Sequence, residues 1–243
     1  MTNQNTGFKR RGLLLVAVVC CAISVTFTMA AQMGQAGSGS QKPVVVIDPG
    51  HGGPDRGVSG ASGVTEKNVA YALAKAIQNK LASACRVHLT RTGDYRVDEN
   101  ERASIANHRQ GDLFVSLHAG GSYRRAVNNW TIYYRDRDKT SGPHLAPDAG
   151  PRRWHQLQNP HAGASASFAE TVKQHLQSGL DAEAIETTPA PLLVLSGVDM
   201  PAVLIETGDL THPAQARALS GDAYRSEVAD AIAGAVVAFL EKK

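Results

Sequence analysis

Apolar residues occur along this chain with two different spacings. Short continuous apolar runs, closed by polar or loop-forming residues, predict buried β-strands. They lie at Val44–Ile47, Leu113–Leu117 and Ala202–Ile205, with further strand candidates at Arg86–Thr90, Thr131–Tyr134 and Leu192–Leu195. Apolar residues at helical spacing predict helices between these runs. The helices are expected after Thr65, at Asn100–Arg109, at Phe168–Leu180 and in the C-terminal stretch that contains Val228–Phe239.

Strands that alternate with helices predict a single α/β domain, in which helices cover both faces of a twisted, mostly parallel or mixed sheet. We place this domain at residues 43–243. Residues 32–42 are rich in Gly, Ser and Gln and predict a flexible linker ahead of the domain. Residues 135–163 are rich in Pro, Gly and Arg and predict a long, basic surface loop.

The N-terminal residues have the composition of an export signal. Three basic residues at positions 9–11 precede an apolar stretch from Gly12 to Phe27, which is followed by small residues. This order predicts that residues 1–31 are a secretory signal peptide. Since roughly 20 apolar residues suffice to span a bilayer, the sequence leaves open that residues 12–31 stay in place as a membrane anchor. Both interpretations predict an exported domain, in the periplasm or cell envelope.

Charge and cysteine content argue against two classes of function. The basic residues at positions 9–11 account for the whole formal net charge of +3, so the rest of the chain is neutral. Because non-specific nucleic-acid binding requires a basic face, we expect no nucleic-acid partner. Cys85 is the one cysteine outside the N-terminal apolar stretch, and its apolar neighbours predict a buried residue rather than a nucleophile.

Residues that can carry chemistry follow the three buried runs. His51 comes four residues after the first run, whereas His118 and Glu206 directly follow the second and third. Ligands bind at the carboxyl ends of strands in open α/β sheets, so these side chains converge if the strands are parallel neighbours. Glu66, at the start of the next helix, can face the same edge. Two histidines and a carboxylate are a common zinc set that leaves one position for water.

Six short blocks of the sequence carry a resemblance to a known family. The blocks are Val45–Gly53, Glu66–Asn68, Leu89–Asp94, Glu101–Arg102 with Ala106–Asn107, Gly111–Ala119 and Pro201–Gly208. Together they resemble the zinc-dependent N-acetylmuramoyl-L-alanine amidases of bacterial cell walls, of the amidase_3 type. The resemblance runs from about Pro43 to Leu240, with the blocks in the family's order.

This resemblance implies a metal centre and a reaction. It implies that His51, Glu66 and His118 hold a Zn²⁺ ion and that Glu206 is the catalytic carboxylate. The implied substrate is peptidoglycan, in which the amide between the lactyl group of N-acetylmuramic acid and L-alanine is hydrolysed. Zinc polarises the scissile carbonyl in such a reaction, while the carboxylate moves a proton from water to the departing amine.

The chain departs from the family's pattern at two places. Gly120 follows the His-Ala pair where Asn is usual, and residues 208–212 read Gly-Asp-Leu-Thr-His where the family usually has Gly-Phe-Leu-Ser-Asn. We expect these changes to affect substrate preference more than the metal set. Some relatives carry an inhibitory helix whose glutamate binds the zinc. No Glu occurs between Glu101 and Glu170, so residues 135–163 offer no such donor.

Each candidate residue also has a purely structural interpretation. His51 can be a turn histidine, Glu66 a first-turn acid favoured by the helix dipole, and His118 a buried histidine at a strand end. Glu206 can be an ion-pair partner of Arg91 or Arg102, whose own interpretation as structural residues we favour over substrate binding. Asp48 is expected to brace the loop or a ligand histidine rather than to bind metal.

Two other classes of protein stay open on the sequence alone. One is a catalytically inactive wall-binding or activator protein with the same fold, which an intact Glu206 disfavours. The other is a membrane-anchored scaffold whose basic loop recruits partners. The sequence also leaves open the stem-peptide preference and the need for a protein activator.

Overall fold

The structure, a computed structural model, describes residues 41–60, 63–120, 130–136, 153–180 and 184–242. The predicted signal or anchor at residues 1–31, most of the predicted linker at 32–42 and residues 137–152 of the predicted basic loop lie outside this part of the chain. The chain from Lys42 onward forms a single structural unit. The description below concerns that unit alone.

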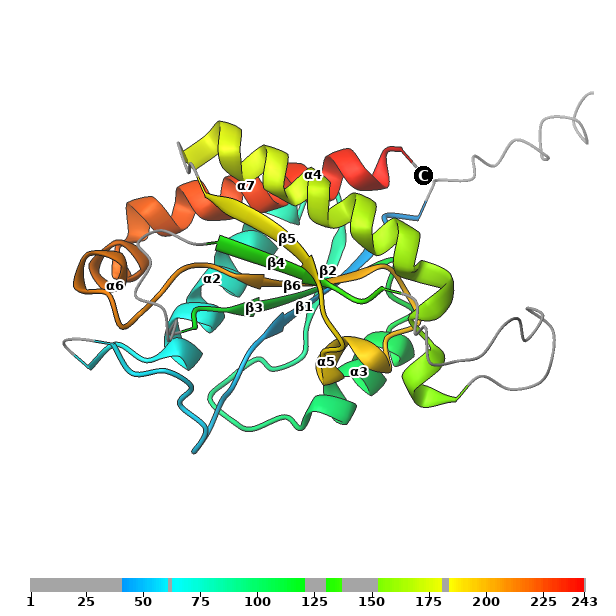
Figure 1. Cartoon of the computed structure of the whole chain (residues 1–243), viewed down its shortest axis with the longest axis horizontal. Helices are drawn as coiled ribbons and strands as arrows, with labels where there is room; N and C mark the ends of the chain where they lie inside the picture. The colour runs from blue at the N-terminus through cyan, green and yellow to red at the C-terminus, as the bar shows by residue number, and fades with distance from the viewer. Residues whose placement is uncertain (1–40, 61–62, 121–129, 137–152, 181–183, 243) are drawn as a thin grey trace, which may run out of the picture. The chain divides into compact units, whose positions relative to one another are not determined.

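A six-stranded mixed sheet lies at the centre of the fold, in the order β2-β1-β3-β6-β4-β5 (Figure 1). The strands are β1 (Val44–Pro49), β2 (Arg86–Leu89), β3 (Leu113–His118), β4 (Trp130–Tyr134), β5 (Ile185–Pro189) and β6 (Ala202–Glu206). Strands β2, β1, β3 and β6 are parallel, whereas β4 runs antiparallel to β6 and parallel to β5. The predicted α/β fold with a mostly parallel or mixed sheet is therefore confirmed.

Helices cover both faces of the sheet, as predicted. They are α2 (Glu66–Leu81), α3 (Glu99–His108), α4 (Ala162–Leu180), α5 (Leu193–Ser196), α6 (Pro213–Ser220) and α7 (Asp222–Leu240), with 3-10 turns η2 (Trp154–Gln156) and η3 (Asn159–His161). Helices α2, α4 and α7 pack on one face, while α3 and α5 pack on the other. Figure 1 shows α4 and α7 side by side above the sheet, with α3 and α5 below it.

The two covered faces explain why β1 reads as a continuous apolar run. Val45 and Ile47 belong to the larger core, which includes α2, α4 and α7. Val44 and Val46 belong to the smaller core, which includes residues of α3 and α5. A strand that is buried on both faces has no position where a polar side chain is favoured, so the usual alternation is lost.

One expectation for an individual element is wrong, and one strand was not expected. The strand predicted at Leu192–Leu195 is instead the short helix α5, which buries Val194 and Leu195 against the smaller core. The strand lies earlier, at β5, where only Ile185 is fully buried because β5 is an edge of the sheet.

The predicted loop at residues 135–163 contains more regular structure than expected. Helix α4 begins at Ala162 rather than at Phe168, and η2 and η3 precede it. Helix α6 was not expected. Cys85 is buried, as predicted. In the described residues, none of the helices combines the length and apolar character that a membrane span requires.

The topology places three strand ends at one edge of the sheet. Strands β1, β3 and β6 are adjacent and parallel, which is the condition under which the sequence analysis expected the candidate residues to converge. Pro49 pairs in register with Leu117, and His118 pairs with Glu206. The carboxyl ends of these strands therefore lie next to one another, which is the edge where α/β folds bind ligands.

Candidate metal centre

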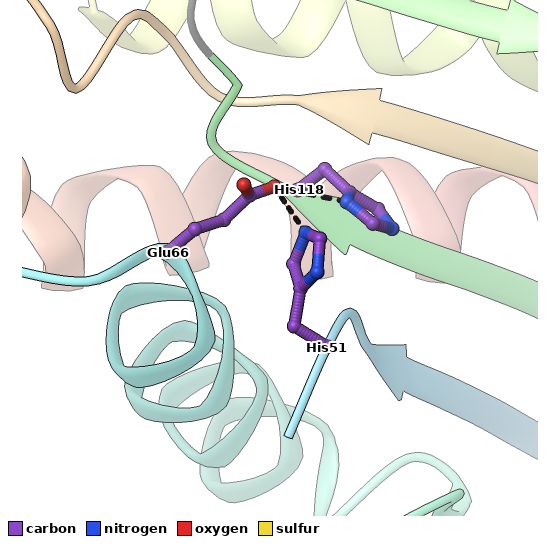
Figure 2. Close-up of side chains that lie close together, drawn as sticks. All are labelled: His51, Glu66 and His118. Atoms are coloured by element: carbon purple, nitrogen blue, oxygen red, sulfur yellow. Dashed lines mark hydrogen bonds and ion pairs between the residues drawn. The ribbon is translucent and has the colours of Figure 1, made fainter. Parts of the chain in front are cut away.

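His51 lies on the loop that leaves β1, in an unusual backbone conformation. Its φ is 59°, and Gly52 and Gly53 follow with φ of 129° and 59°. Such left-handed values are rare for a residue with a Cβ atom. They turn the chain sharply after β1, so that the His51 imidazole faces the start of α2 (Figure 2).

Glu66 is the first residue of α2 and is almost completely buried. Its Oε2 accepts a hydrogen bond from the backbone N–H of Val58 at 2.8 Å, and its Oε1 accepts one from the N–H of Ala119 at 3.1 Å. These bonds tie the carboxylate to the loop before α2 and to the residue after β3. The helix start also favours a negative charge at this position.

The two histidines meet on this carboxylate. Glu66 Oε1 lies 3.0 Å from His51 Nε2 and 2.9 Å from His118 Nδ1. The two imidazole rings are 5.0 Å apart between centroids and nearly perpendicular, at 75°. Figure 2 shows the three side chains pointing toward one another from the β1 loop, the first turn of α2 and the end of β3. The structure therefore brings together the three residues that the sequence singled out as ligands.

The geometry and chemistry of this group fit a metal ion. One ligand atom from each residue can be chosen so that all lie within 4.8 Å of one another. Two imidazole nitrogens and a carboxylate oxygen are a donor set that suits zinc. His51 and His118 would hold the ion through ring nitrogens that carry no proton, because only deprotonated nitrogens ligate metals.

Two glycines leave the space that this centre occupies. A Cβ atom at Gly50 would lie 2.4 Å from Cε1 of His118. A Cβ atom at Gly57, where φ is +61°, would lie 2.5 Å from Oε2 of Glu66 and 2.6 Å from Cδ2 of His51. Both contacts are far below normal separations, so the backbone approaches the ligands as closely as only glycine allows.

The ionisable groups of the centre shift the pKa values of His51 and Glu66. Burial lowers the pKa of His51, but hydrogen bonds to Glu66 and Asp55 and their negative charges outweigh burial, so the pKa is raised. Burial raises the pKa of Glu66, but hydrogen bonds from His118, His51 and the Val58 N–H outweigh it and lower the pKa far below its ordinary value. Glu66 is consequently an ionised carboxylate, the form that binds metal.

Asp55 is a functional candidate that the sequence analysis did not identify. Its Oδ2 lies 2.9 Å from His51 Nδ1, and its Oδ1 accepts a hydrogen bond from the Gly57 N–H at 3.0 Å. The His51 nitrogen that faces away from Glu66 is therefore held by a second carboxylate, an arrangement that orients ligand histidines in metal sites. The only signal in the sequence is an acid four residues after the histidine within a glycine-rich turn.

Glu206 ends β6 beside His118. Its Oε2 accepts a hydrogen bond from the backbone N–H of Gly120 at 2.7 Å. Burial raises the pKa of Glu206; the electrostatic interaction with His118 and the Gly120 hydrogen bond oppose this rise, whereas the charge of Glu66 adds to it. A Cβ atom at Gly120 would lie 2.8 Å from this Oε2. Gly120, which stands where the family usually has Asn, therefore lies against the candidate catalytic carboxylate.

Asp48, Arg91 and Arg102 form a buried support beneath the centre. Asp48 accepts hydrogen bonds from Arg102, Thr90 and Ser116. The described hydrogen bonds of Arg102 go to Asp48 and backbone carbonyls, and those of Arg91 go to backbone carbonyls; neither arginine is bonded to Glu206. Arg91 also lies over the ring of Tyr71, 5.1 Å from its centroid. Asp48 therefore braces the loop, one of the two functions expected of it, while Asp55 rather than Asp48 contacts the ligand histidine.

Comparison with known proteins agrees with the resemblance in the sequence. A family model described as N-acetylmuramoyl-L-alanine amidase matches residues 45–238 of the chain. The N-acetylmuramoyl-L-alanine amidase AmiA of Escherichia coli (strain K12) is 31% identical over 224 residues, which cover 82% of this chain and 76% of that protein.

Solved structures show the same similarity. The N-acetylmuramoyl-L-alanine amidase AmiC2 of Nostoc punctiforme matches with a TM-score of 0.69 at 30% identity, covering 84% of this chain and 99% of that one. An N-acetylmuramoyl-L-alanine amidase from Clostridium difficile 630 matches with a TM-score of 0.68 at 28% identity, covering 84% of this chain and 100% of that one.

Proposed function

Since this chain belongs to the N-acetylmuramoyl-L-alanine amidase family, we propose that its catalysis depends on a zinc ion held by His51, Glu66 and His118. The chain is an amidase that acts on peptidoglycan. In the proposed reaction, Glu206 is the catalytic base, and the bond that breaks joins the lactyl group of N-acetylmuramic acid to L-alanine. The observation that carries the proposal is the convergence of the three ligands beside Glu206, at the carboxyl ends of adjacent parallel strands.

Each ligand has a distinct support in the proposed site. Asp55 holds His51 Nδ1, which leaves Nε2 as the nitrogen that faces the metal. Glu66 is fixed by the Val58 and Ala119 N–H groups. The backbone carbonyl of His118 accepts hydrogen bonds from the N–H and the hydroxyl of Thr207, at 2.8 and 2.9 Å, so the ends of β3 and β6 stay together.

The proton transfers fall to Glu206. When bound, zinc supplies a Lewis acid that polarises the scissile carbonyl and makes water a stronger acid. Glu206 takes a proton from the attacking water and delivers it to the amide nitrogen, which is a poor leaving group until it is protonated. The Gly120 N–H holds one carboxylate oxygen of Glu206 in place, so the other oxygen is left to move the proton.

We extend the proposal to the whole chain. Residues 1–31 direct export as a signal peptide or remain as an anchor, residues 32–42 are a linker, and residues 43–243 are the catalytic domain. The substrate lies outside the cytoplasm, so catalysis takes place in the periplasm or cell envelope. A wall-binding protein without activity would need neither the ligand set nor Glu206, and their joint presence supports the enzyme over that alternative.

The proposal is tested by exchanging each glutamate for its amide. Glu206→Gln keeps the size of the side chain and removes its basicity, so zinc content is retained while turnover falls about 10²–10⁴-fold, the usual contribution of general acid–base catalysis. Glu66→Gln loses zinc, because a neutral amide is a weaker ligand than a carboxylate. Zinc content and the release of L-alanine-terminated peptides are measured for both variants. Near-normal turnover of Glu206→Gln contradicts the mechanism. If Glu206→Gln loses zinc while Glu66→Gln keeps it, Glu206 is the zinc ligand and Glu66 is the catalytic base.

A further inference from the structure

We propose that Arg91 and Arg102 are positioning residues that fix the His51 loop in its ligating shape before a metal binds. The loop is defined here as residues 49–53. This inference rests on the proposed function in one respect, namely that His51 is a zinc ligand. It goes beyond that function by naming the groups that hold the ligand in place.

The Arg102 guanidinium spans the whole turn at the end of β1. Its Nη1 donates to the carbonyl oxygen of Pro49 at 3.0 Å, and its Nη2 donates to that of His51 at 3.0 Å. Its Nε donates to the carbonyl oxygen of Val97 at 3.0 Å, which anchors the group just before α3. Arg102 is only 5% exposed. One rigid, planar group thus binds the loop on both sides of Gly50.

Arg91 shares the Pro49 carbonyl group with Arg102, binds the Gly50 carbonyl group that Arg102 leaves out, and also reaches α2. Its Nε donates to the carbonyl oxygen of Pro49 and its Nη2 to that of Gly50, both at 3.0 Å. The same Nη2 donates to the carbonyl oxygen of Lys67 at 2.8 Å. Lys67 directly follows the ligand Glu66. Arg91, which is 2% exposed, therefore couples the backbone beside one ligand to the backbone beside another.

The loop needs such a clamp because its backbone is strained. His51, Gly52 and Gly53 all have positive φ. A residue with a Cβ atom holds that conformation only where the surrounding contacts over-determine it. The carbonyl oxygens of Pro49, Gly50 and His51 are each bound by a guanidinium group. These contacts supply the constraint.

Asp48 keeps the Arg102 charge inside the protein. Its carboxylate is 0% exposed and lies 2.6 Å from Arg102 Nη1. The hydroxyls of Thr90 and Ser116 donate to its two oxygens at 2.5 and 2.8 Å. The carboxylate is thereby fully engaged on β1, and it holds Arg102 against the loop. A lysine could replace the charge of either arginine but not its fork of donors, which binds several carbonyl groups at once.

The test compares zinc affinity with stability in three arginine variants. Arg91→Lys and Arg102→Lys keep the charge and lose the fork. Arg135→Lys is the matched control: Arg135 is 9% exposed and donates to Ser196 Oγ at 2.8 Å and to the His155 carbonyl oxygen at 3.3 Å. It follows Tyr134, and because β4 is antiparallel to β6, it lies at the opposite end of the sheet from Glu206. Zinc affinity is measured by competition with a chromophoric chelator, and thermal unfolding is measured without metal.

We expect Arg91→Lys and Arg102→Lys to weaken zinc binding by about 10–100-fold, as the loss of supporting groups does in other metal sites. Arg135→Lys should lower thermal stability to a similar degree and leave zinc affinity within about two-fold. Unchanged zinc affinity in both loop variants overturns the proposal, as does an equal loss of affinity in Arg135→Lys. If wild type and His51→Ala bind zinc equally, the proposed metal site is wrong. That result is distinct from a failure of the arginine proposal alone, in which His51→Ala loses zinc but the arginine variants keep it.

A second measurement needs no variant and therefore does not depend on how the variants fold. Hydrogen exchange of the wild-type protein is followed over residues 49–53 with and without zinc. The N–H groups of Gly50, Gly52 and Gly53 already donate to Leu117, Asp55 and Asp94. A preset loop is protected equally in both states. Protection that arises only when zinc is added means that the metal, not the arginines, shapes the loop, and the proposal fails.

Discussion

Gly57 lies where the backbone comes close to two of the proposed metal ligands at once. This residue combines a left-handed φ of +61° with a position where a Cβ atom would overlap the carboxylate of Glu66 and the ring of His51. Either requirement alone selects glycine. A side chain at this position would therefore have two effects: it would strain the backbone, and it would displace the proposed ligands.

Replacing Gly57 with alanine should therefore harm metal binding more than it harms the fold. We expect Gly57→Ala to lose zinc and to lower the free energy of unfolding by at least the roughly 1–2 kcal/mol that a left-handed residue costs. Gly63→Ala is the control, because Gly63 has a φ of +77° and nothing lies within 4 Å of its would-be Cβ atom. Zinc content and thermal unfolding are compared for the two. Equal zinc retention shows that Gly57 does not shape the site.

Asp55 shows at the same scale what the sequence could not predict. An acid four residues after a histidine has no general meaning in a loop. Here Gly52 and Asp55 exchange backbone hydrogen bonds of 3.0 and 3.2 Å, which fold the chain back and bring the carboxylate to His51. That contact depends on the positive φ values of the turn, which cannot be predicted from composition or from the spacing of residues.

Among the elements, the buried strands were the most predictable, because burial on both faces requires a continuous apolar run that is easily recognised in the sequence. Strands β1, β3 and β6 are covered on both faces, so their apolar runs and the polar residues that follow them stand out. This also made His118 and Glu206 identifiable as residues at strand ends. Strand β5 was missed because an edge strand needs few apolar residues. Helix α5 was mistaken for a strand because an apolar run of four residues fits both structures.

Removing one partner from the buried ion pair between β1 and α3 should strongly destabilise the fold. Asp48 is buried and binds Arg102, Thr90 and Ser116, so Asp48→Asn leaves the Arg102 charge without its partner. Breaking a buried pair in this way costs about 3–5 kcal/mol. Denaturant unfolding of the metal-free protein measures the loss.

A surface pair supplies the comparison for this prediction. Asp230 binds Lys80 at 2.7 Å between α7 and α2, and both side chains are exposed. Asp230→Asn should therefore change the free energy of unfolding by no more than about 1 kcal/mol. Equal losses in Asp48→Asn and Asp230→Asn would mean that the buried carboxylate is not the stabilising group we infer.

For the molecule as a whole, we propose that the N-terminal residues decide where the enzyme acts. If residues 1–31 are a signal peptide, the mature protein begins near Ala31 or Gln32 and is recovered in the soluble envelope fraction. Intact-mass measurement of the exported protein, together with fractionation of the cells, checks this expectation. Full-length chain found solely in the membrane fraction would support the anchor instead.

This chain is an amidase that acts on peptidoglycan, and we propose that a metal ion takes part in cutting the amide bond. The decisive experiment digests purified peptidoglycan with the purified protein, with and without chelator, and identifies the products by mass spectrometry. We expect peptides that begin with a free L-alanine amino group, and glycan strands whose muramic acid keeps its lactyl group. Chelator should abolish these products, and added zinc should restore them. Cleavage within the peptide or the glycan, or the same products in the presence of chelator, would contradict the account.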